Sequence, residues 1–278
     1  MQSVARFRAA LAVAQQCPAH LGNELALTGS AARGWADDDS DIEFVSWCPQ
    51  VPSPGARRAW LESIGASELA PDPHASTDGT IWDWSRFHGF WLETGWQSIR
   101  RHEELLRAIR NGSVTDHRLV IVADAIVHAV PLRTEGLLEG WQRQLQVYPD
   151  ATQHALIRAG ARRWQYALSY WALARRGDRI ATTERLLADV QSVLRMVFAR
   201  NRIWEPAWKW SARRYGELTV QPARMAERID EILSFVNLER SCQVCAELFD
   251  DTLALVPADV DVTSARNTIL ASLRDRAP

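Results

Sequence analysis

Lysine is almost absent from this sequence: of its 32 basic residues, 31 are arginine and Lys209 is the lone lysine. Cysteine is also scarce, with four residues in 278, and no signal peptide is recognisable. This usage is typical of a reduced protein, so we expect a cytoplasmic location. No apolar run approaches the roughly 20 residues of a membrane span, which argues against a membrane partner.

Charge is nearly balanced over the whole chain but uneven along it. The formal net charge is −2 at pH 7, which gives no general reason to expect a nucleic acid as partner. Residues 1–100 carry 7 Arg against 12 Asp and Glu, a balance of −5, whereas the remainder carries 25 basic and 22 acidic residues, a balance of +3. An acidic N-terminal part suits a metal-loading site and would favour a cationic co-substrate.

Residues 25–47 combine a short apolar run, a polar loop and a second apolar run. In the second run, Asp41 and Glu43 alternate with Ile42 and Phe44. Side chains of a strand alternate between its faces, so we expect both carboxylates on one side and both apolar residues in the core. Neighbouring like charges are unfavourable unless a cation lies between them, and paired oxygen ligands suit Mg²⁺.

Gly29-Ser30 precedes these carboxylates, where bare backbone N–H groups and a hydroxyl could hold phosphates. Each half alone has an ordinary structural interpretation, since residues 40–43 could equally be a helix cap followed by an acidic first turn. The order of the two halves is more specific. It resembles the nucleotidyltransferases of the DNA polymerase beta superfamily, in particular the two-domain antibiotic branch that includes kanamycin nucleotidyltransferases.

The resemblance implies a metal-dependent transfer of a nucleoside monophosphate. It implies a third carboxylate on the strand beside the acidic pair, which we place at Glu93, with Asp83 as the fallback. Two Mg²⁺ ions and ATP or another NTP are expected as cofactor and substrate. The expected metal and catalytic residues are Asp41, Glu43 and Glu93, and the expected nucleotide-binding residues are Gly29, Ser30, Arg33, Ser40, Lys209 and Arg202.

The evidence for Lys209 and Arg202 is a segment that concentrates three basic residues and three tryptophans within residues 200–210. Basic side chains interleaved with aromatic ones can hold phosphates and stack a base. The alternative is that Trp204 and Trp208, one helical turn apart, serve packing only. Because an ammonium is a compact point charge suited to phosphate, we expect Lys209 to contact the triphosphate.

The sequence departs from the resemblance at the general base. Kanamycin-type enzymes carry a glutamate on the first long helix of the second domain, whereas residues 162–167 here, around Gln165, contain no carboxylate. Glu93 itself, Glu184 and Asp189 are the alternatives, and a further one is that no base is present. A positioned base usually contributes about 10²–10⁴-fold, so its loss would slow the transfer and leave metal binding unchanged.

The pattern of apolar residues predicts an α+β fold: a small mixed sheet with flanking helices over residues 1–133, followed by a helical bundle over residues 134–278. We expect an exposed loop at residues 66–79 and a hairpin at 80–95. The apolar stretch 114–130 is either a strand or a buried helix.

The leading functional hypothesis is transfer of AMP from ATP to a hydroxyl of a small molecule, such as an aminoglycoside-like antibiotic or a biosynthetic intermediate. A second hypothesis keeps the chemistry and makes tRNA or a protein the acceptor. A third is a catalytically silent nucleotide-binding module. The sequence leaves the acceptor, the preferred base and the oligomeric state open.

Overall fold

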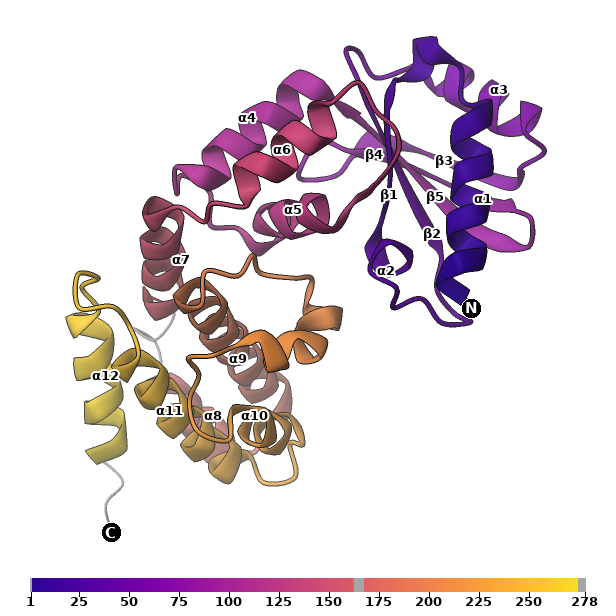
Figure 1. Ribbon diagram of the computed structural model, residues 1–278. Coiled ribbons are helices and arrows are strands. Elements are labelled where there is room, and N and C mark those ends of the chain that lie inside the picture. Colours follow the sequence, from indigo (N-terminus) through magenta and orange to yellow (C-terminus); the bar gives the residue numbers. More distant parts are fainter. Residues whose placement is uncertain (1, 163–167, 275–278) are drawn as a thin grey trace. The chain divides into compact units, whose positions relative to one another are not determined.

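The computed structural model describes residues 2–162 and 168–274. A six-stranded mixed sheet with flanking helices is followed by a helical C-terminal part, which confirms the predicted α+β class (Figure 1). Within these residues, none of the helices has both the length and the apolar character that crossing a membrane requires.

The chain divides into two compact units. A short segment, called the exchanged segment below, interrupts the first unit in sequence and belongs to the second. The first unit comprises Met1–Ile109 and Arg118–Val147, and the second comprises Arg110–His117 and Tyr148–Pro278. The predicted boundary lies between residues 133 and 134, so the helix at 137–145 falls in the first unit of the structure and not with the bundle. Its packing against the sheet, described below, is the reason.

The first unit contains all six strands found in the part of the chain that the structure describes. They are β1 (Glu24–Thr28), β2 (Ile42–Cys48), β3 (Ser67–Ala75), β4 (Ile81–Phe87), β5 (Phe90–Ser98) and β6 (Val130–Arg133). Its helices are α1 (Gln2–Gln16), the one-turn η1 (Ala19–Leu21), α2 (Gly29–Ala32), α3 (Pro54–Ser63), α4 (Ile99–Arg110), α5 (His117–His128) and α6 (Leu137–Leu145), of which α4 and α5 reach the exchanged segment at one end.

The strand order is β3-β4-β5-β2-β1-β6, so the two strands that carry the candidate carboxylates are neighbours. β2 and β5 pair in parallel, whereas every other pairing in the sheet is antiparallel. A parallel pair needs a crossover connection, and α3, β3 and β4 provide it between β2 and β5. The sheet therefore brings residues about 50 positions apart in the sequence into direct register.

The two faces of the sheet are covered by different helices (Figure 1). One face carries the apolar core formed with α1 and α3, to which the sheet contributes Leu25, Leu27, Ile42, Phe44, Leu92 and Trp96. On the other face, Trp47 of β2 packs against His102 of α4 and Trp141 of α6, with ring centroids 5.3 Å away in both contacts. Burial lowers the pKa of His102 to about 3, so its imidazole is neutral within this core.

The structure changes one local expectation and decides two points that the sequence left open. The predicted loop at residues 66–79 contains β3, an exposed edge strand whose Pro71 and Pro73 are tolerated because an edge strand needs only one paired side. The ambiguous stretch at 114–130 resolves into helix α5, with β6 starting at Val130. The tryptophan segment after residue 200 is irregular, not α-helical, and passes into the 3₁₀ segment η3 (Trp208–Glu217).

The second unit is helical, as the sequence predicts. Its elements are α7 (Asp150–Arg162), α8 (Leu168–Arg175), α9 (Arg179–Arg200), η3, α10 (Met225–Leu233), α11 (Leu238–Ala254) and α12 (Thr263–Arg274). Gly160 lets α7 approach α9 closely, because a Cβ at this position would lie 3.0 Å from the carbonyl oxygen of Ser192. The Gln153 side chain adds a hydrogen bond of 2.9 Å from α7 to the Ala199 carbonyl near the end of α9.

A buried glutamate at the start of β1 holds α6 against the sheet. The Glu24 side chain is almost fully buried, and it accepts hydrogen bonds from the backbone N–H groups of Leu137 (3.2 Å) and Leu138 (3.1 Å). It also accepts one from the hydroxyl of Thr134 at 3.0 Å. A carboxylate near the first turn of a helix satisfies N–H groups that have no partner within the helix.

We predict that Glu24→Ala lowers the free energy of unfolding by about 2–3 kcal/mol, because it leaves several buried N–H groups without an acceptor. Urea denaturation measures the change. Glu62→Ala is the control, since Glu62 makes an exposed ion pair with Arg58 and its loss should cost about 0.5 kcal/mol or less. Equal losses in the two variants would show that the Glu24 contacts do not stabilise the fold.

Candidate functional site

The centre of the candidate site is the turn between β1 and α2. Gly29 has a φ of +65°, a left-handed conformation that favours glycine. A Cβ at this position would lie 2.7 Å from Oε2 of Glu43 and closer still to the rest of that carboxylate. The backbone therefore favours glycine here, and the turn lies directly against the Glu43 carboxylate, which a Cβ would push aside. The two halves of the sequence motif meet in the structure.

Glu43 and Glu93 occupy the same level of the sheet. They are register partners in the parallel β2–β5 pair, and residues paired in this way project from the same face. Thr28 is the partner of Glu43 on β1, and Trp84 is the partner of Glu93 on β4. One row across the sheet thus runs Thr28, Glu43, Glu93, Trp84, and Trp84 donates its indole N–H to Oε1 of Glu93 at 2.9 Å.

Asp41 immediately precedes β2 in the loop that follows α2, and it is partly exposed. Among the described residues, no three His, Cys, Asp or Glu side chains are gathered closely enough to hold a metal ion by themselves. The structure therefore brings Glu43 and Glu93 together with Gly29, whereas the full three-carboxylate metal set with Asp41 stays a prediction.

The fallback carboxylate, Asp83, lies on the other face of the sheet. It neighbours Trp84 on β4, and its side chain enters the core, where Arg57 Nη2 is 3.6 Å from it and the Trp96 indole N–H donates to it at 2.9 Å. Burial raises the pKa of this carboxyl, and the Arg57 charge and the Trp96 hydrogen bond oppose that rise. Asp83 is a buried structural group, and Glu93 is the carboxylate on the face of Glu43.

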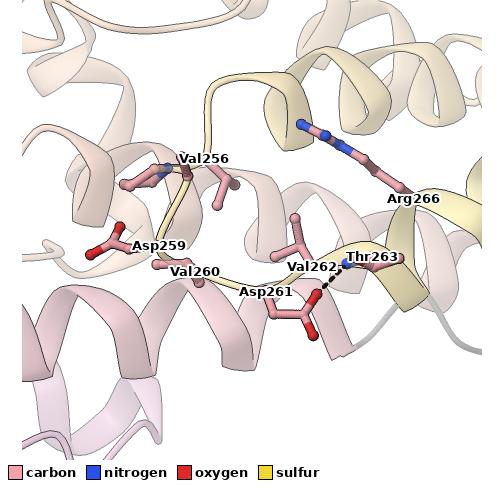
Figure 2. Close-up of a pocket in the computed structure, with 9 residues that line it drawn as sticks. Val256, Asp259, Val260, Asp261, Val262, Thr263 and Arg266 are labelled. Atoms are coloured by element: carbon pink, nitrogen blue, oxygen red, sulfur yellow. Dashed lines mark hydrogen bonds between the residues drawn. The ribbon is translucent and has the colours of Figure 1, made fainter.

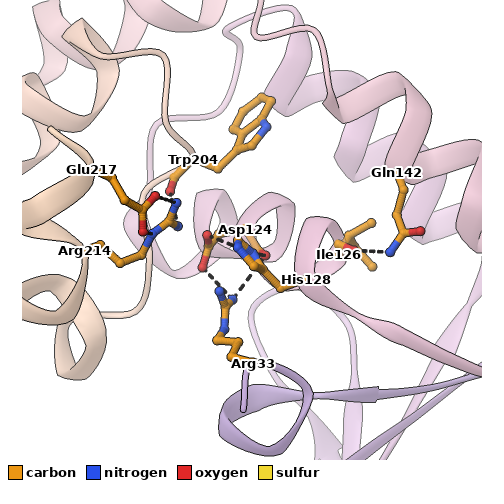
Figure 3. Close-up of polar contacts among 8 residues, drawn as sticks. All are labelled: Arg33, Asp124, Ile126, His128, Gln142, Trp204, Arg214 and Glu217. Carbon is orange, nitrogen blue, oxygen red and sulfur yellow. Dashed lines mark hydrogen bonds and ion pairs between the residues drawn. The ribbon is translucent and has the colours of Figure 1, made fainter. Parts of the chain in front are cut away.

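Arg33 makes a contact that the sequence did not predict. Its side chain is almost fully buried, and its guanidinium lies 2.7 Å from the carboxylate of Asp124 in α5 and 3.2 Å from the carbonyl oxygen of the same residue (Figure 3). Arg33 thus joins the turn after Gly29 to α5. Its predicted contact with the nucleotide is not part of this geometry and stays a prediction.

Asp124 also fixes the orientation of His128. Nδ1 of His128 lies 2.9 Å from the Asp124 carbonyl oxygen, and a carbonyl only accepts, so Nδ1 carries the proton (Figure 3). In the neutral ring, Nε2 is then the acceptor. Neither residue stood out in the sequence, because an Asp and a His four residues apart within an apolar helix have many ordinary uses.

The acidic loop before Asp41 is held by a buried arginine of α1. Arg6 donates to the carbonyl oxygens of Ser40 (2.7 Å) and Asp38 (3.1 Å). The Ser40 hydroxyl in turn donates to Asp37 at 2.7 Å. Ser40 therefore shapes the loop that leads into β2. The sequence signal for Arg6 is a single charge within the buried stripe of an amphipathic helix.

Ser30 is buried in the turn, and its carbonyl oxygen accepts a backbone hydrogen bond of 2.9 Å from Trp35. That bond closes the turn on itself and fixes the backbone that follows Gly29. The predicted contact between the Ser30 hydroxyl and phosphate is not tested by this geometry.

The tryptophan segment of the second unit is built around the buried Glu205. Arg195 (3.4 Å) and His117 (3.2 Å) lie beside its carboxylate. Trp208 stacks on His117 with ring centroids 3.7 Å apart and planes 9° apart, and Trp204 packs on Tyr148 at 4.4 Å. Both tryptophans therefore have aromatic partners within their own unit, which supports the packing interpretation for them.

The basic residues of this segment differ in their surroundings. Lys209 is exposed, and its ammonium lies 5.4 Å from the centre of the Trp210 ring. Arg202 forms an ion pair with Asp150 and donates to the Tyr148 carbonyl oxygen at 2.9 Å. Arg202 is thus engaged within the second unit. The predicted phosphate contacts of both residues remain predictions.

The alternatives for the general base stay open. Glu184 is exposed on α9 and Asp189 is buried in the same helix. The segment around Gln165, where the sequence lacks the expected carboxylate, lies outside the described residues.

Arg214, close to the end of η3, pairs with Glu217 and donates to the Trp204 carbonyl oxygen, which fixes η3 to the tryptophan segment (Figure 3).

A pocket of about 300 Å³ lies elsewhere in the second unit, lined by residues 256–263 and Arg266 (Figure 2). One of its carboxylates, Asp261, accepts the backbone N–H of Thr263 at 2.9 Å and so caps the start of α12. None of the candidate residues lines this pocket. We assign it no ligand.

Comparison with known proteins finds a partial match to one family profile and a similar solved structure, but it does not assign this chain to a family. The profile of a family described as "Domain of unknown function (DUF4037)" matches residues 95–211, which begin near the end of β5 and exclude Gly29, Glu43 and Glu93. A crystal structure of a nucleotidyltransferase-like protein from Exiguobacterium sibiricum 255-15 is similar at a TM-score of 0.44 and 11% identity, covering 95% of this chain and 78% of that chain. No curated protein matches.

The contact between Gly29 and Glu43 gives a direct prediction. Gly29→Ala and Gly34→Ala both place a Cβ on a left-handed backbone, which costs about 1–2 kcal/mol in each. The Cβ of Gly34→Ala meets open space, whereas that of Gly29→Ala overlaps the Glu43 carboxylate. The Glu43 carboxylate is the end of a flexible side chain and can turn aside, so we expect Gly29→Ala to lower the melting temperature at least as much as Gly34→Ala, with only a small additional loss. A smaller drop for Gly29→Ala than for Gly34→Ala, measured by circular dichroism, would contradict the contact between this turn and Glu43.

Proposed function

We propose that this protein is a metal-dependent nucleotidyltransferase that transfers AMP from ATP to a hydroxyl of a small molecule and releases pyrophosphate. The observation that carries the proposal is the row of Glu43 and Glu93 in register, with Gly29 against Glu43. A glycine turn and acidic side chains on one face of a sheet are the parts that phosphoryl transfer needs: a place for phosphates and ligands for their cations.

Magnesium fits the side chains present. All three candidate ligands, Asp41, Glu43 and Glu93, offer carboxylate oxygens, which Mg²⁺ prefers. Two carboxylates in register on neighbouring strands repel each other, and a divalent cation relieves that repulsion. Mg²⁺ usually takes one or two carboxylates and completes its shell with water and substrate phosphates, so a preformed cluster of three protein ligands is not needed.

Backbone and side-chain groups of this chain would bind the phosphates and accept the proton. Gly29 and Ser30 offer backbone N–H groups and a hydroxyl to the β- and γ-phosphates, and Gly29 leaves room for the Glu43 carboxylate beside them. Bound metal would neutralise charge on the triphosphate and lower the pKa of the acceptor hydroxyl. The hydroxyl oxygen forms the new bond to the α-phosphorus while the bond to the pyrophosphate oxygen breaks. The acceptor proton passes to Glu93, Glu184 or Asp189, or to solvent if no general base is present.

Incubation with α-labelled ATP and Mg²⁺ tests the proposal. Saccharides, aminoglycosides and other hydroxylated amines are offered as acceptors, with tRNA and a protein mixture as separate arms. We expect label on a small molecule together with pyrophosphate release. Label on tRNA or protein alone would assign a macromolecular acceptor. A protein that neither transfers label nor binds Mg·ATP is not a nucleotidyltransferase.

We predict that Asp41→Asn and Glu43→Gln each lower transfer about a thousandfold, because each removes a charge that a metal ion requires and adds no bulk. The melting temperature without nucleotide should stay within a few degrees of wild type. A second measurement is independent of turnover: the rise in melting temperature with Mg·ATP should shrink in both variants. Near-normal transfer by Asp41→Asn would remove Asp41 from the metal site.

Lys209→Ala should weaken Mg·ATP binding or lower turnover about ten- to a hundredfold, because a charge-assisted hydrogen bond contributes roughly 1.5–3 kcal/mol. Lys209→Arg should restore part of the loss, since a guanidinium is larger and planar. Arg213→Ala is the matched control, because the Arg213 guanidinium lies 5.2 Å from the same Trp210 ring. If calorimetry gives the same dissociation constant for wild type and Lys209→Ala, and the two rates are equal, Lys209 is an ordinary surface residue with no role in nucleotide binding.

A further inference from the structure

Two large apolar side chains lie exposed on the hairpin beside Glu93. Trp84 of β4 is 40% exposed and Trp91 of β5 is 45% exposed, which is unusual for residues of this size. Trp84 is the register partner of Glu93, and Trp91 lies two residues before Glu93 on the same strand. Both tryptophans therefore project from the face of the sheet that carries Glu43 and Glu93.

This aromatic surface has fixed local contacts. The Trp84 indole N–H donates to Glu93 at 2.9 Å, so the ring is tied to the carboxylate. The Arg86 guanidinium lies 4.1 Å from the centre of the Trp91 ring, and Arg86 and Trp91 are also register partners. Glu68 of β3 is 3.8 Å from Arg86. The hairpin thus presents two indoles and a guanidinium that are held in place before any ligand binds.

The order of the residues in this row indicates the side of the sheet from which the acceptor hydroxyl would approach the nucleotide. Gly29 and Ser30 follow β1, on one side of Glu43, whereas Trp84 stands on β4, on the far side of Glu93. Attacking and leaving oxygens lie roughly in line through the phosphorus in phosphoryl transfer. If the pyrophosphate lies over the turn after β1, the attacking hydroxyl enters from the side of β5 and β4.

We propose that Trp84 and Trp91 form the binding surface for the acceptor, and that the acceptor is a hydroxylated ring, a saccharide or a cyclitol. This inference rests on the proposed function. An indole face covers the C–H face of a saturated ring, and the Glu93 carboxylate and Arg86 guanidinium beside it offer an acceptor and donors to ring hydroxyls. An open-chain polyol has no such face and loses more conformational freedom when it binds.

Steady-state kinetics with two acceptors of similar hydroxyl content test this surface. Inositol represents a ring and sorbitol an open chain with the same number of hydroxyls, and any aminoglycoside labelled in the panel above is a third. We expect wild type to prefer the rings. Trp91→Ala should raise the KM for the ring acceptor about tenfold and leave the KM for ATP unchanged, and Trp91→Phe should retain most of the binding.

Trp84→Phe keeps a ring and removes the hydrogen bond to Glu93, so we expect a fall in kcat together with a smaller rise in acceptor KM. Val4→Ala is the control: Val4 is 54% exposed on α1, whose helix covers the opposite face, and its loss should change neither constant. Melting temperatures measured alongside separate a binding defect from unfolding.

Each remaining outcome distinguishes this inference from the proposed function. An active wild type whose acceptor KM is unchanged in Trp91→Ala and Trp84→Phe overturns the aromatic surface and leaves the proposed function standing. A rise confined to the KM for ATP also overturns it, because the indoles would then serve the nucleotide. Label transfer to tRNA or protein alone overturns the ring acceptor. Absence of both transfer and Mg·ATP binding in wild type rejects the proposed function itself.

Discussion

The parallel pairing of β2 with β5 is the constraint on which the candidate site depends. It places Glu43 and Glu93 side by side on one face, although 50 positions separate them in the sequence. Two adjacent carboxylates cost free energy in the fold unless a cation neutralises them. The pairing of β2 with β5 therefore decides which two carboxylates lie side by side, and a metal ion between them is our proposal.

Supporting contacts hold the segments on both sides of that pair. Glycine at position 29 lets the turn after β1 pass directly against Glu43. Arg33 then ties the same turn to Asp124 of α5, and Arg6 ties the loop that follows to α1. Breaking the buried ion pair of Arg33 would leave a buried charge without its partner, and removing Arg6 would leave two carbonyl oxygens without their donor, so both arginines hold the backbone of the turn and loop in one conformation. A preorganised loop loses less entropy when a phosphate group binds.

The two faces of the sheet use their polar groups differently. Asp83 and Glu93 are both carboxylates of the β4–β5 hairpin, and alternation of the strand sends them to opposite sides. Asp83 meets Arg57 in the core and stabilises packing there, whereas Glu93 meets Trp84 on a face that remains accessible. The hairpin thus carries one carboxylate in the core and another on the opposite face, one residue apart in register.

Hydrophobic periodicity and turn residues are local properties, so they were enough to predict the α+β class and the helical C-terminal part. The sequence also indicated the alternation of Asp41 and Glu43 with core residues, since a strand has a period of two. It placed the third carboxylate at Glu93 with Asp83 as the fallback, but only the strand pairing shows that Glu93 lies level with Glu43, and the sequence did not identify the Pro-containing residues 67–75 as an edge strand. The partnerships of Arg33 with Asp124 and of Trp84 with Glu93 were likewise decided only by tertiary structure, because they depend on which segments lie side by side and not on the residues near them in the chain.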